Sequence, residues 1–157
     1  DLEWNLLQYA PHQQISQYLT DLNYIYHREP ALYTQDFEEA GFEWIDCNDS
    51  RHSVVSFIRR AKDSDECIIV VCNFTPQPHA HYRIGVPEHG FYTELFNSDA
   101  RKYGGSNMGN LGGKWADEWS IHNRKFSLDL CIPPLGVLML KIDRERTLAA
   151  YQWRDEK

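Results

Sequence analysis

The 157-residue sequence contains 16 basic and 23 acidic residues, which gives a formal net charge of −7. That acidic balance argues against nucleic acid or an anionic membrane as a partner, but it is neutral toward uncharged ligands. Hydrophobic residues make up 42% and charged residues 25%, which excludes a disordered chain and is typical of a folded domain. The longest apolar run, residues 68–71, is far below the roughly 20 residues that span a bilayer.

The first forty residues are expected to be helical. One apolar stripe recurs at i, i+4, i+7 and i+11, the spacing of one face of an α-helix. Its members are Ile15, Leu19, Leu22 and Tyr26, with Tyr18 and Ile25 beside them. Pro11 suits a first turn, and Pro30 ends the helix near Arg28. A single helix cannot bury this stripe alone, so it needs the following domain, an absent domain, or a second copy of the chain as a dimer.

After Gly41 the hydrophobic period changes to two, which predicts strands. We expect them over residues 53–60, 66–73, 81–86, 91–97, 125–131 and 136–142, after an earlier strand that places Trp44 in the core. Residues 67–72 are apolar on both faces, so this strand should be central. Seven or so short strands within residues 41–143, joined by segments rich in Asn, Asp, Gly and Pro, predict an antiparallel β-sandwich with Greek-key connections. The fold class is therefore mainly β, preceded by one or two α-helices.

Two segments after Gly41 lack the alternating pattern that predicts a strand. Residues 98–119 are rich in Gly and Asn and too long for a turn, so we expect a folded surface loop whose glycines serve positive φ angles. Residues 144–157 are polar, and a frayed or weakly helical tail is the simplest expectation.

The four cysteines indicate buried free thiols in a reducing cytoplasm, and no C-x-x-C pattern is present. Cys67 and Cys72 have opposite parity on one predicted strand, so they should face opposite sides and cannot bridge each other.

No catalytic or metal centre is evident in the sequence. Neighbouring carboxylates occur at Glu38-Glu39, Asp46 with Asp49, and Asp117-Glu118, but adjacent acids on turns are usually solvated. His79 and His81 could share one strand face, yet no third ligand is close in sequence, so two solvent-exposed histidines are expected instead of a zinc site. We therefore assign no catalytic residue, metal or cofactor.

Aromatic residues near the long loop suggest a different kind of site. Sugars present apolar C–H faces that stack on aromatic rings and hydroxyls that need polar partners. Tyr103, Trp115, Trp119 and Asn107 lie in or beside the loop and are our candidates for glucan contact. The alternative is that the two tryptophans cover the open edge of the sandwich.

Several short motifs occur in a fixed order along the chain. They are Phe42-Glu43-Trp44-Ile45-Asp46, Asn73-Phe74-Thr75-Pro76, Tyr82-Arg83-Ile84-Gly85-Val86-Pro87, Asn97-Ser98-Asp99 with Tyr103-Gly104-Gly105-Ser106-Asn107-Met108-Gly109-Asn110, and Pro133-Pro134-Leu135-Gly136. In this order and spacing, residues 1 to about 142 resemble the carboxy-terminal end of a bacterial-type 1,4-α-glucan (glycogen) branching enzyme. Gln13 after His12 departs from the family pattern, and residues beyond Ile142 match no family feature.

The resemblance implies that residues 1–40 are the end of a catalytic (β/α)8 barrel, with its last helix at about 12–28. Residues 41–143 would then be the all-β carboxy-terminal domain shared with α-amylases. Asp1, in place of an initiator Met, fits such a fragment. The resemblance also implies a parent that moves an α-1,4-glucan chain onto a 6-hydroxyl in the cytoplasm, while the fragment alone lacks the catalytic acids and is expected to be inactive.

Three functions follow from these observations. The first is an accessory domain that supports the barrel and positions glucan, with the absent barrel and α-glucan as partners. The second is an autonomous carbohydrate-binding β-sandwich module. The third is a generic interaction domain with no link to glycans.

Overall fold

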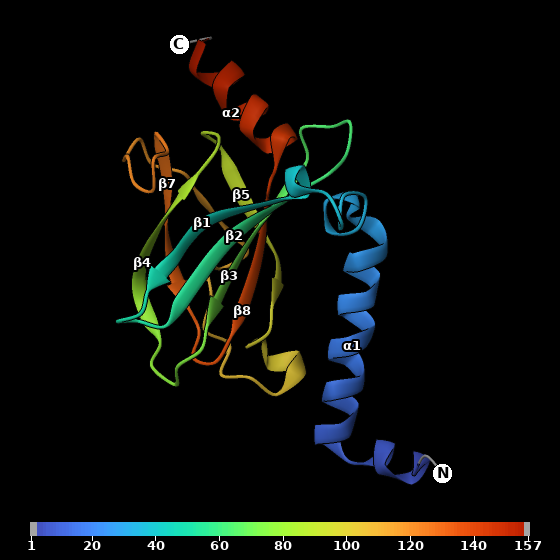
Figure 1. The fold of residues 1–157 in the computed structure, drawn as a ribbon. Coiled ribbons are helices and arrows are strands. Elements are labelled where there is room, and N and C mark those ends of the chain that lie inside the picture. The colour runs from blue at the N-terminus through green and yellow to red at the C-terminus, as the bar shows by residue number, and fades with distance from the viewer. Residues whose placement is uncertain (1–2, 156–157) are drawn as a thin grey trace.

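A computed structural model describes residues 3–155 as a β-sandwich flanked by two helices (Figure 1). The eight strands are β1 (Phe42–Asp49), β2 (Val54–Arg60), β3 (Cys67–Asn73), β4 (His79–Val86), β5 (Phe91–Asn97), β6 (Gly113–Trp115), β7 (Phe126–Ile132) and β8 (Val137–Ile142). The helices are α1 (Ala10–Arg28) and α2 (Arg144–Asp155), with short 3-10 turns η1 (Trp4–Gln8), η2 (Pro30–Leu32), η3 (Glu39–Gly41) and η4 (Arg101–Tyr103). The predicted antiparallel β-sandwich with a preceding helix is confirmed.

The two layers of the sandwich differ in size. One sheet has six strands in the order β1-β2-β3-β8-β5-β6, and the other pairs only β4 with β7. All pairings are antiparallel, and β8 lies between β3 and β5, so strands adjacent in space are often distant in sequence. The chain passes from the six-stranded sheet to the two-stranded sheet before β4 and again before β7, and it returns after each of these strands. These crossings are the Greek-key connections that were expected.

The main core lies between the two sheets. Alternate residues of β3, β7 and β8 point inward, and Ile69, Leu128 and Leu140 are fully buried there. A second cluster covers the other face of the six-stranded sheet, where Ile68 and Val70 pack beneath Ala31 of η2. Both faces of β3 are therefore covered. This explains why residues 67–72 are apolar on both faces, as expected for a central strand.

Helix α1 runs along one flank of the sandwich, and its first turns extend beyond the end of the sheets (Figure 1). It begins with Pro11 in the first turn and ends at Arg28 before Pro30, as predicted. The side that meets the sandwich carries Tyr18, whose ring lies 5.2 Å from that of Phe96 on β5. Two of the stripe residues, Ile15 and Leu19, remain 64% and 52% exposed, so the sandwich does not bury the stripe.

Residues 144–155 form a regular helix, where the sequence had suggested a frayed or weakly helical tail. The cause is Thr147, which is buried and whose hydroxyl accepts a hydrogen bond from the Phe91 backbone N–H at 3.0 Å. The same hydroxyl donates to the Asp143 carbonyl at 2.7 Å. α2 is therefore attached to β5 at its first turns and projects away from the sandwich at the end opposite η1 (Figure 1). Residues 156–157 lie outside the described part of the chain.

Two predictions about single side chains were wrong. Trp44 is 50% exposed, because Ile45 takes the inward position on β1 and Trp44 faces outward beside Phe42. His79 is half-buried against the rings of His52 and Tyr82, because an irregularity between His79 and Tyr82 breaks the alternation of β4.

The cysteine predictions are confirmed in part. All four thiols are free, and Cys67 and Cys72 belong to different clusters on opposite faces of β3. Only Cys67 is fully buried, however, because Cys72 and Cys131 are partly buried and Cys47 is exposed on β1. Among residues 3–155, no helix is long and apolar enough to cross a membrane.

Candidate functional site

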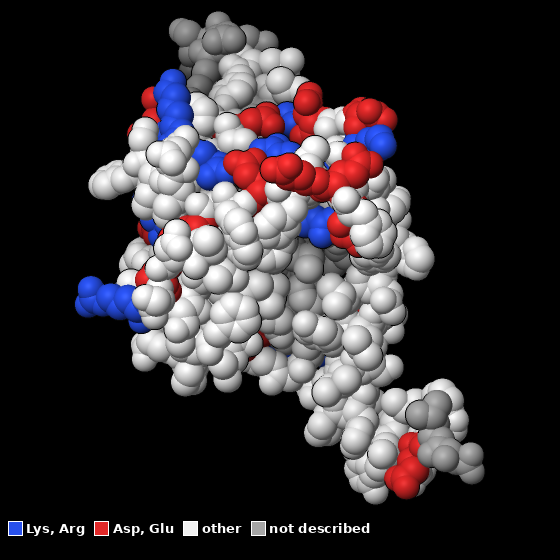
Figure 2. All heavy atoms as spheres, viewed as in Figure 1, with Lys and Arg blue, Asp and Glu red and all other residues white. Residues whose placement is uncertain are grey.

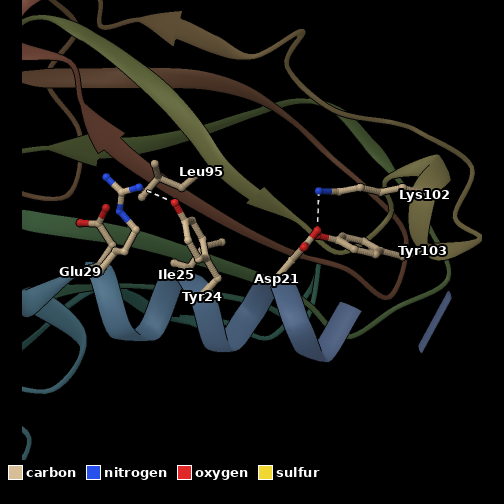
Figure 3. Close-up of a pocket in the computed structure, with 8 residues that line it drawn as sticks. Asp21, Tyr24, Ile25, Glu29, Leu95, Lys102 and Tyr103 are labelled. Carbon is tan, nitrogen blue, oxygen red and sulfur yellow. Dashed lines mark hydrogen bonds and ion pairs between the residues drawn. The ribbon is translucent and has the colours of Figure 1, made fainter. Parts of the chain in front are cut away.

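The most densely connected polar group between helix and sandwich is the carboxylate of Asp21 on α1. It accepts hydrogen bonds from Lys102 Nζ at 2.6 Å and from the Tyr103 hydroxyl at 2.7 Å, both on η4. Its second oxygen accepts from Gln17, one turn earlier on α1, at 2.6 Å. In Figure 3, Lys102 and Tyr103 reach Asp21 from the side opposite the helix. Asp21 therefore joins α1 to the long loop after β5.

These hydrogen bonds change the acidities of all three groups. Donation from Lys102 and Tyr103 lowers the pKa of Asp21 below its ordinary value. The same carboxylate raises the pKa of Lys102. Burial, followed by the hydrogen bond to Asp21, raises the pKa of Tyr103. At neutral pH the cluster thus holds an ionised Asp21, a charged Lys102 and a neutral Tyr103.

A pocket of about 450 Å³ opens beside this cluster, between α1 and β5. Figure 3 shows Tyr24 and Ile25 rising from α1 toward Leu95 on β5. Arg28 donates to the Tyr24 hydroxyl and lies over that ring, 5.3 Å from its centre. Glu29 lines the far end of the pocket. It is held by Lys141 of β8 at 2.7 Å, so both ends of this pocket carry an ion pair between helix and sandwich.

The loop that carries Tyr103 is shaped by Asp99. Its carboxylate accepts hydrogen bonds from the Ser106 N–H and hydroxyl at 2.9 and 2.6 Å and from the Met108 N–H at 3.0 Å. Gly104 ends η4 with φ of +88°, a conformation that glycine adopts without steric cost. Asn107 also has positive φ, +66°, and its side-chain oxygen accepts from the Arg101 N–H. The side-chain oxygen of Asn107 is therefore engaged within the loop.

Asn110 fixes the far end of the same loop to both sheets. It is 3% exposed, and its amide nitrogen donates to Glu94 on β5 at 2.9 Å and to the Cys131 carbonyl on β7 at 3.1 Å. Its side-chain oxygen accepts from the Cys131 N–H at 2.9 Å. A single buried amide thus ties the loop to strands in the two layers.

The two tryptophans lie at the other end of β5. Trp115 is 37% exposed on the short edge strand β6, and its ring contacts Phe91 at 5.7 Å. Trp119 is 62% exposed, and the Arg83 guanidinium lies 5.1 Å from its ring centre. Trp115 pairs with Phe91 at the start of β5, whereas Tyr103 contacts Phe96 near its end. Five residues of extended strand separate these points by about 17 Å, so the four candidates do not form one cluster.

An uncharged face is left open on the six-stranded sheet. Figure 2 shows charged side chains gathered over η2, η3 and the adjacent ends of β1 and β2, while the middle of this view is almost free of them. Phe42, Trp44 and Phe57 form a row of touching rings on β1 and β2. We call this row, with the partly buried Met139, the outer apolar face.

A second open apolar surface lies on α1 and η1. Trp4, Leu7, Ile15 and Leu19 line a hollow of about 400 Å³, and each of the four is more than two-fifths exposed. We call these four residues the helix stripe; only Ile15 and Leu19 are shared with the stripe expected from the sequence. Trp4 therefore does not pack on the sandwich.

Three of the acidic residues noted in the sequence pair with ordinary partners. Asp49 accepts from His52 and from the Tyr82 hydroxyl, Asp117 pairs with Arg83, and Glu38 pairs with Lys62. Within residues 3–155 there is no cluster of three or more side chains suited to hold a metal ion.

Of the residues in this cluster and pocket, the sequence analysis named Tyr103 as a candidate, but not Asp21, Tyr24, Arg28 or Lys102. Asp21, Tyr24 and Arg28 lie on α1, beside the apolar residues from which the helix was predicted. Only the spacing Gln17-Asp21-Tyr24-Arg28, a polar and aromatic side of the same helix, could have indicated them.

The fold and the sequence match define the class of protein. Residues 44–143 match the family model described as the alpha amylase, C-terminal all-beta domain, which is most of the chain and runs from the third residue of β1 through β8. The chain belongs to this family.

Within it, the chain is very similar to one group of enzymes. It is 73% identical over 149 residues to the 1,4-alpha-glucan branching enzyme GlgB of Thermosynechococcus vestitus, covering 95% of this chain and 20% of that protein. It is 69% identical over 155 residues to the GlgB of Synechocystis sp. PCC 6803, covering 97% of this chain and 20% of that protein. The chain thus spans about a fifth of the length of the curated relatives it matches.

Among solved structures, the similarity is lower. The crystal structure of the trehalulose synthase MutB from Pseudomonas mesoacidophila is 21% identical, with a TM-score of 0.43, and covers 78% of this chain and 17% of that one.

Proposed function

We propose that this chain is the carboxy-terminal accessory domain of a cytoplasmic 1,4-α-glucan branching enzyme, together with the last helix of its catalytic barrel. The observation that carries the proposal is the 73% identity to a GlgB over 95% of the chain, which extends through α1 as well as the sandwich. An autonomous carbohydrate-binding module is not favoured, because such a module would not need the helical segment before residue 41. The reaction of the parent would be transfer of an α-1,4-glucan chain to a 6-hydroxyl.

The role of the domain in that enzyme would be support of the barrel. Two open apolar surfaces favour this role, the outer apolar face and the helix stripe, because exposed apolar side chains that cluster on one flank are typical of a contact surface. We infer that the rest of the parent covers both. Chains studied alone would then be free to pair through the helix stripe as a dimer.

Glucan contact by Tyr103, Trp115, Trp119 and Asn107 stays a prediction. Trp115 and Trp119 are exposed enough to stack on a sugar ring, whereas Tyr103 and Asn107 already bond within the protein. The barrel would hold the catalytic acids, so this chain alone should transfer no glucan. Branching of amylose by a pure sample of the chain, followed by the loss of iodine staining, would overturn that expectation.

A matched pair of leucines tests the supporting role. Leu19 in the helix stripe and Leu148 on α2 are 52% and 59% exposed, so both substitutions to Glu should be tolerated in the chain alone. In the full-length parent, Leu19→Glu would place an unpaired charge in the barrel contact and lower the free energy of unfolding by about 3 kcal/mol. Leu148→Glu should leave both the thermal midpoint and branching unchanged. Equal behaviour of the two variants in the parent would contradict the proposal.

A further inference from the structure

We infer that the pocket between α1 and β5 is a binding site for a short neutral oligosaccharide of α-linked glucose. This inference rests on the proposed function for the identity of the sugar, but the position of the site comes from the geometry of the pocket. The site differs from the tryptophan surface expected from the sequence, because it is formed by α1, β5 and η4.

The size and shape of the pocket suit a small ligand. Its volume of about 450 Å³ lies within the roughly 300–1,000 Å³ range that is usual for small-molecule sites. Tyr24 is 59% exposed and Tyr103 is half-buried, and both rings line the pocket. With Ile25 and Leu95 they offer the apolar surfaces on which the C–H faces of a pyranose ring pack.

The charges that line the pocket favour a neutral ligand. Asp21 and Glu29 supply two negative charges, and Arg28 and Lys102 supply two positive charges, so the formal charges cancel. A phosphate or other anion would meet two carboxylates, and a cation would meet two basic groups. A polyhydroxyl ligand, in contrast, can use the carboxylates as acceptors and the basic groups as donors at the same time.

The polar groups are held in place before any ligand arrives. Asp21 is fixed by Lys102 and Tyr103, and Glu29 by Lys141. Arg28 is oriented by the Tyr24 hydroxyl, its only hydrogen-bond partner among the described residues, so most of its N–H groups remain for a ligand. Groups that are already ordered lose less entropy on binding, which favours affinity.

Occupation of this pocket would join two parts of the chain. Asp21, Tyr24 and Arg28 belong to α1, whereas Leu95 and Lys102 belong to the sandwich. A ligand that touches both sides should hold the helix more firmly against β5. The saccharide would thus stabilise the element that we propose to contact the barrel.

The test is a titration of the chain with maltotriose, followed by backbone amide shifts. We expect saturable shifts confined to residues 21–29 and 95–103. Tyr24→Ala should weaken the affinity about tenfold, because it removes the main exposed ring. Tyr24→Phe keeps the ring and should bind within about threefold of the native chain. Tyr9→Ala is the matched control, since Tyr9 is similarly exposed at 55% and lies outside the pocket, and it should have no effect.

Other ligands and outcomes separate this inference from the proposed function. Inorganic phosphate and cellotriose, whose glucose units are β-linked, should leave these amides unshifted; equal shifts with phosphate would show an anion site and overturn the inference. Shifts near Trp115 and Trp119 alone would favour glucan contact at the other end of β5 and also overturn it. No response to maltotriose, together with the expected loss of stability in the Leu19→Glu parent, would overturn the oligosaccharide site and leave the accessory role standing.

Discussion

The Tyr103 hydroxyl donates a 2.7 Å hydrogen bond to the Asp21 carboxylate, although 82 residues separate the two in sequence. Tyr103 also places its ring 5.2 Å from Tyr18, one turn before Asp21 on the same helix. The loop after β5 therefore holds α1 by one polar and one aromatic contact. This relationship explains why α1 keeps a defined position although its apolar stripe is exposed.

Tyr103→Phe should loosen α1 without unfolding the sandwich. The substitution removes the hydrogen bond to Asp21 and keeps the ring contact, which should cost about 1 kcal/mol. Amide hydrogen exchange across residues 14–25 should therefore become about fivefold faster. The control is Tyr33→Phe, because Tyr33 is an exposed tyrosine whose hydroxyl makes no hydrogen bond to α1 among residues 3–155. Unchanged exchange in Tyr103→Phe would show that the ring contact alone positions the helix.

Acid should detach α1 before the sandwich unfolds. Because the folded-state pKa of Asp21 lies below the ordinary value of 3.8, its contribution is fully present above 3.8 and is lost as the pH falls through the lowered value. Asp21 is partly exposed, so the contribution should be no more than about 1 kcal/mol. Hydrogen exchange in α1, corrected for its intrinsic pH dependence, should show this loss below pH 3.8 in the native chain. Asp21→Asn should show no such step, and an identical step in that variant would assign the effect to another carboxylate.

Asn110→Ala should be one of the most damaging polar substitutions in the sandwich. It removes an amide that bonds to Glu94 on one sheet and to both backbone groups of Cys131 on the other. Leaving those buried groups unpaired should lower the free energy of unfolding by about 2–3 kcal/mol, measured by urea denaturation. Asn48→Ala, at an exposed position of β1, should change it by less than about 0.5 kcal/mol. Equal midpoints for the two variants would be inconsistent with this role of Asn110.

The thiols should differ in their reaction with iodoacetamide. Cys47 is exposed and should be alkylated first. Burial raises the pKa of both Cys67 and Cys72, so the thiolate that reacts is scarce at pH 8 and poorly accessible. Mass spectrometry of digested samples should find the label on Cys47 early and on Cys67 only in concentrated urea. Rapid labelling of Cys67 in native buffer would indicate that β3 opens easily.

Strand positions were predictable from the sequence because alternation and turn residues are local signals. The period-two pattern from residue 53 onward places six of the eight strands to within two residues, and an earlier strand was expected at Trp44 without defined bounds. β6 was missed because it is only three residues long and pairs through Gly113, a residue that weakens any strand pattern. The identity of the buried residue on β1 was also missed. Trp44 and Ile45 are both hydrophobic, and only the pairing with β2 decides which one points inward.

The candidate site was less predictable than the fold. Tyr103 was named as a candidate because it lies in an unusual loop, but its partner Asp21 is on a helix whose docking angle no local pattern encodes. Trp115 and Trp119 are near Tyr103 in sequence and at the other end of β5 in space, because β6 turns back along that strand. Proximity in sequence within a long loop is thus a weak guide to proximity in the folded chain.

The position of β8 determines when the six-stranded sheet can form during synthesis. β8 is the last strand in the sequence, yet it lies in the middle of the six-stranded sheet, between β3 and β5. During synthesis, β1–β3 and β5–β6 can form only as two separate pieces, each with an apolar edge, until residue 142 has left the ribosome. The nascent chain therefore passes through a period in which two unpaired strand edges, on β3 and β5, are open to other chains. Translational pauses that hold β8 inside the ribosome should prolong that period and increase aggregation, whereas pauses after β8 has emerged should not.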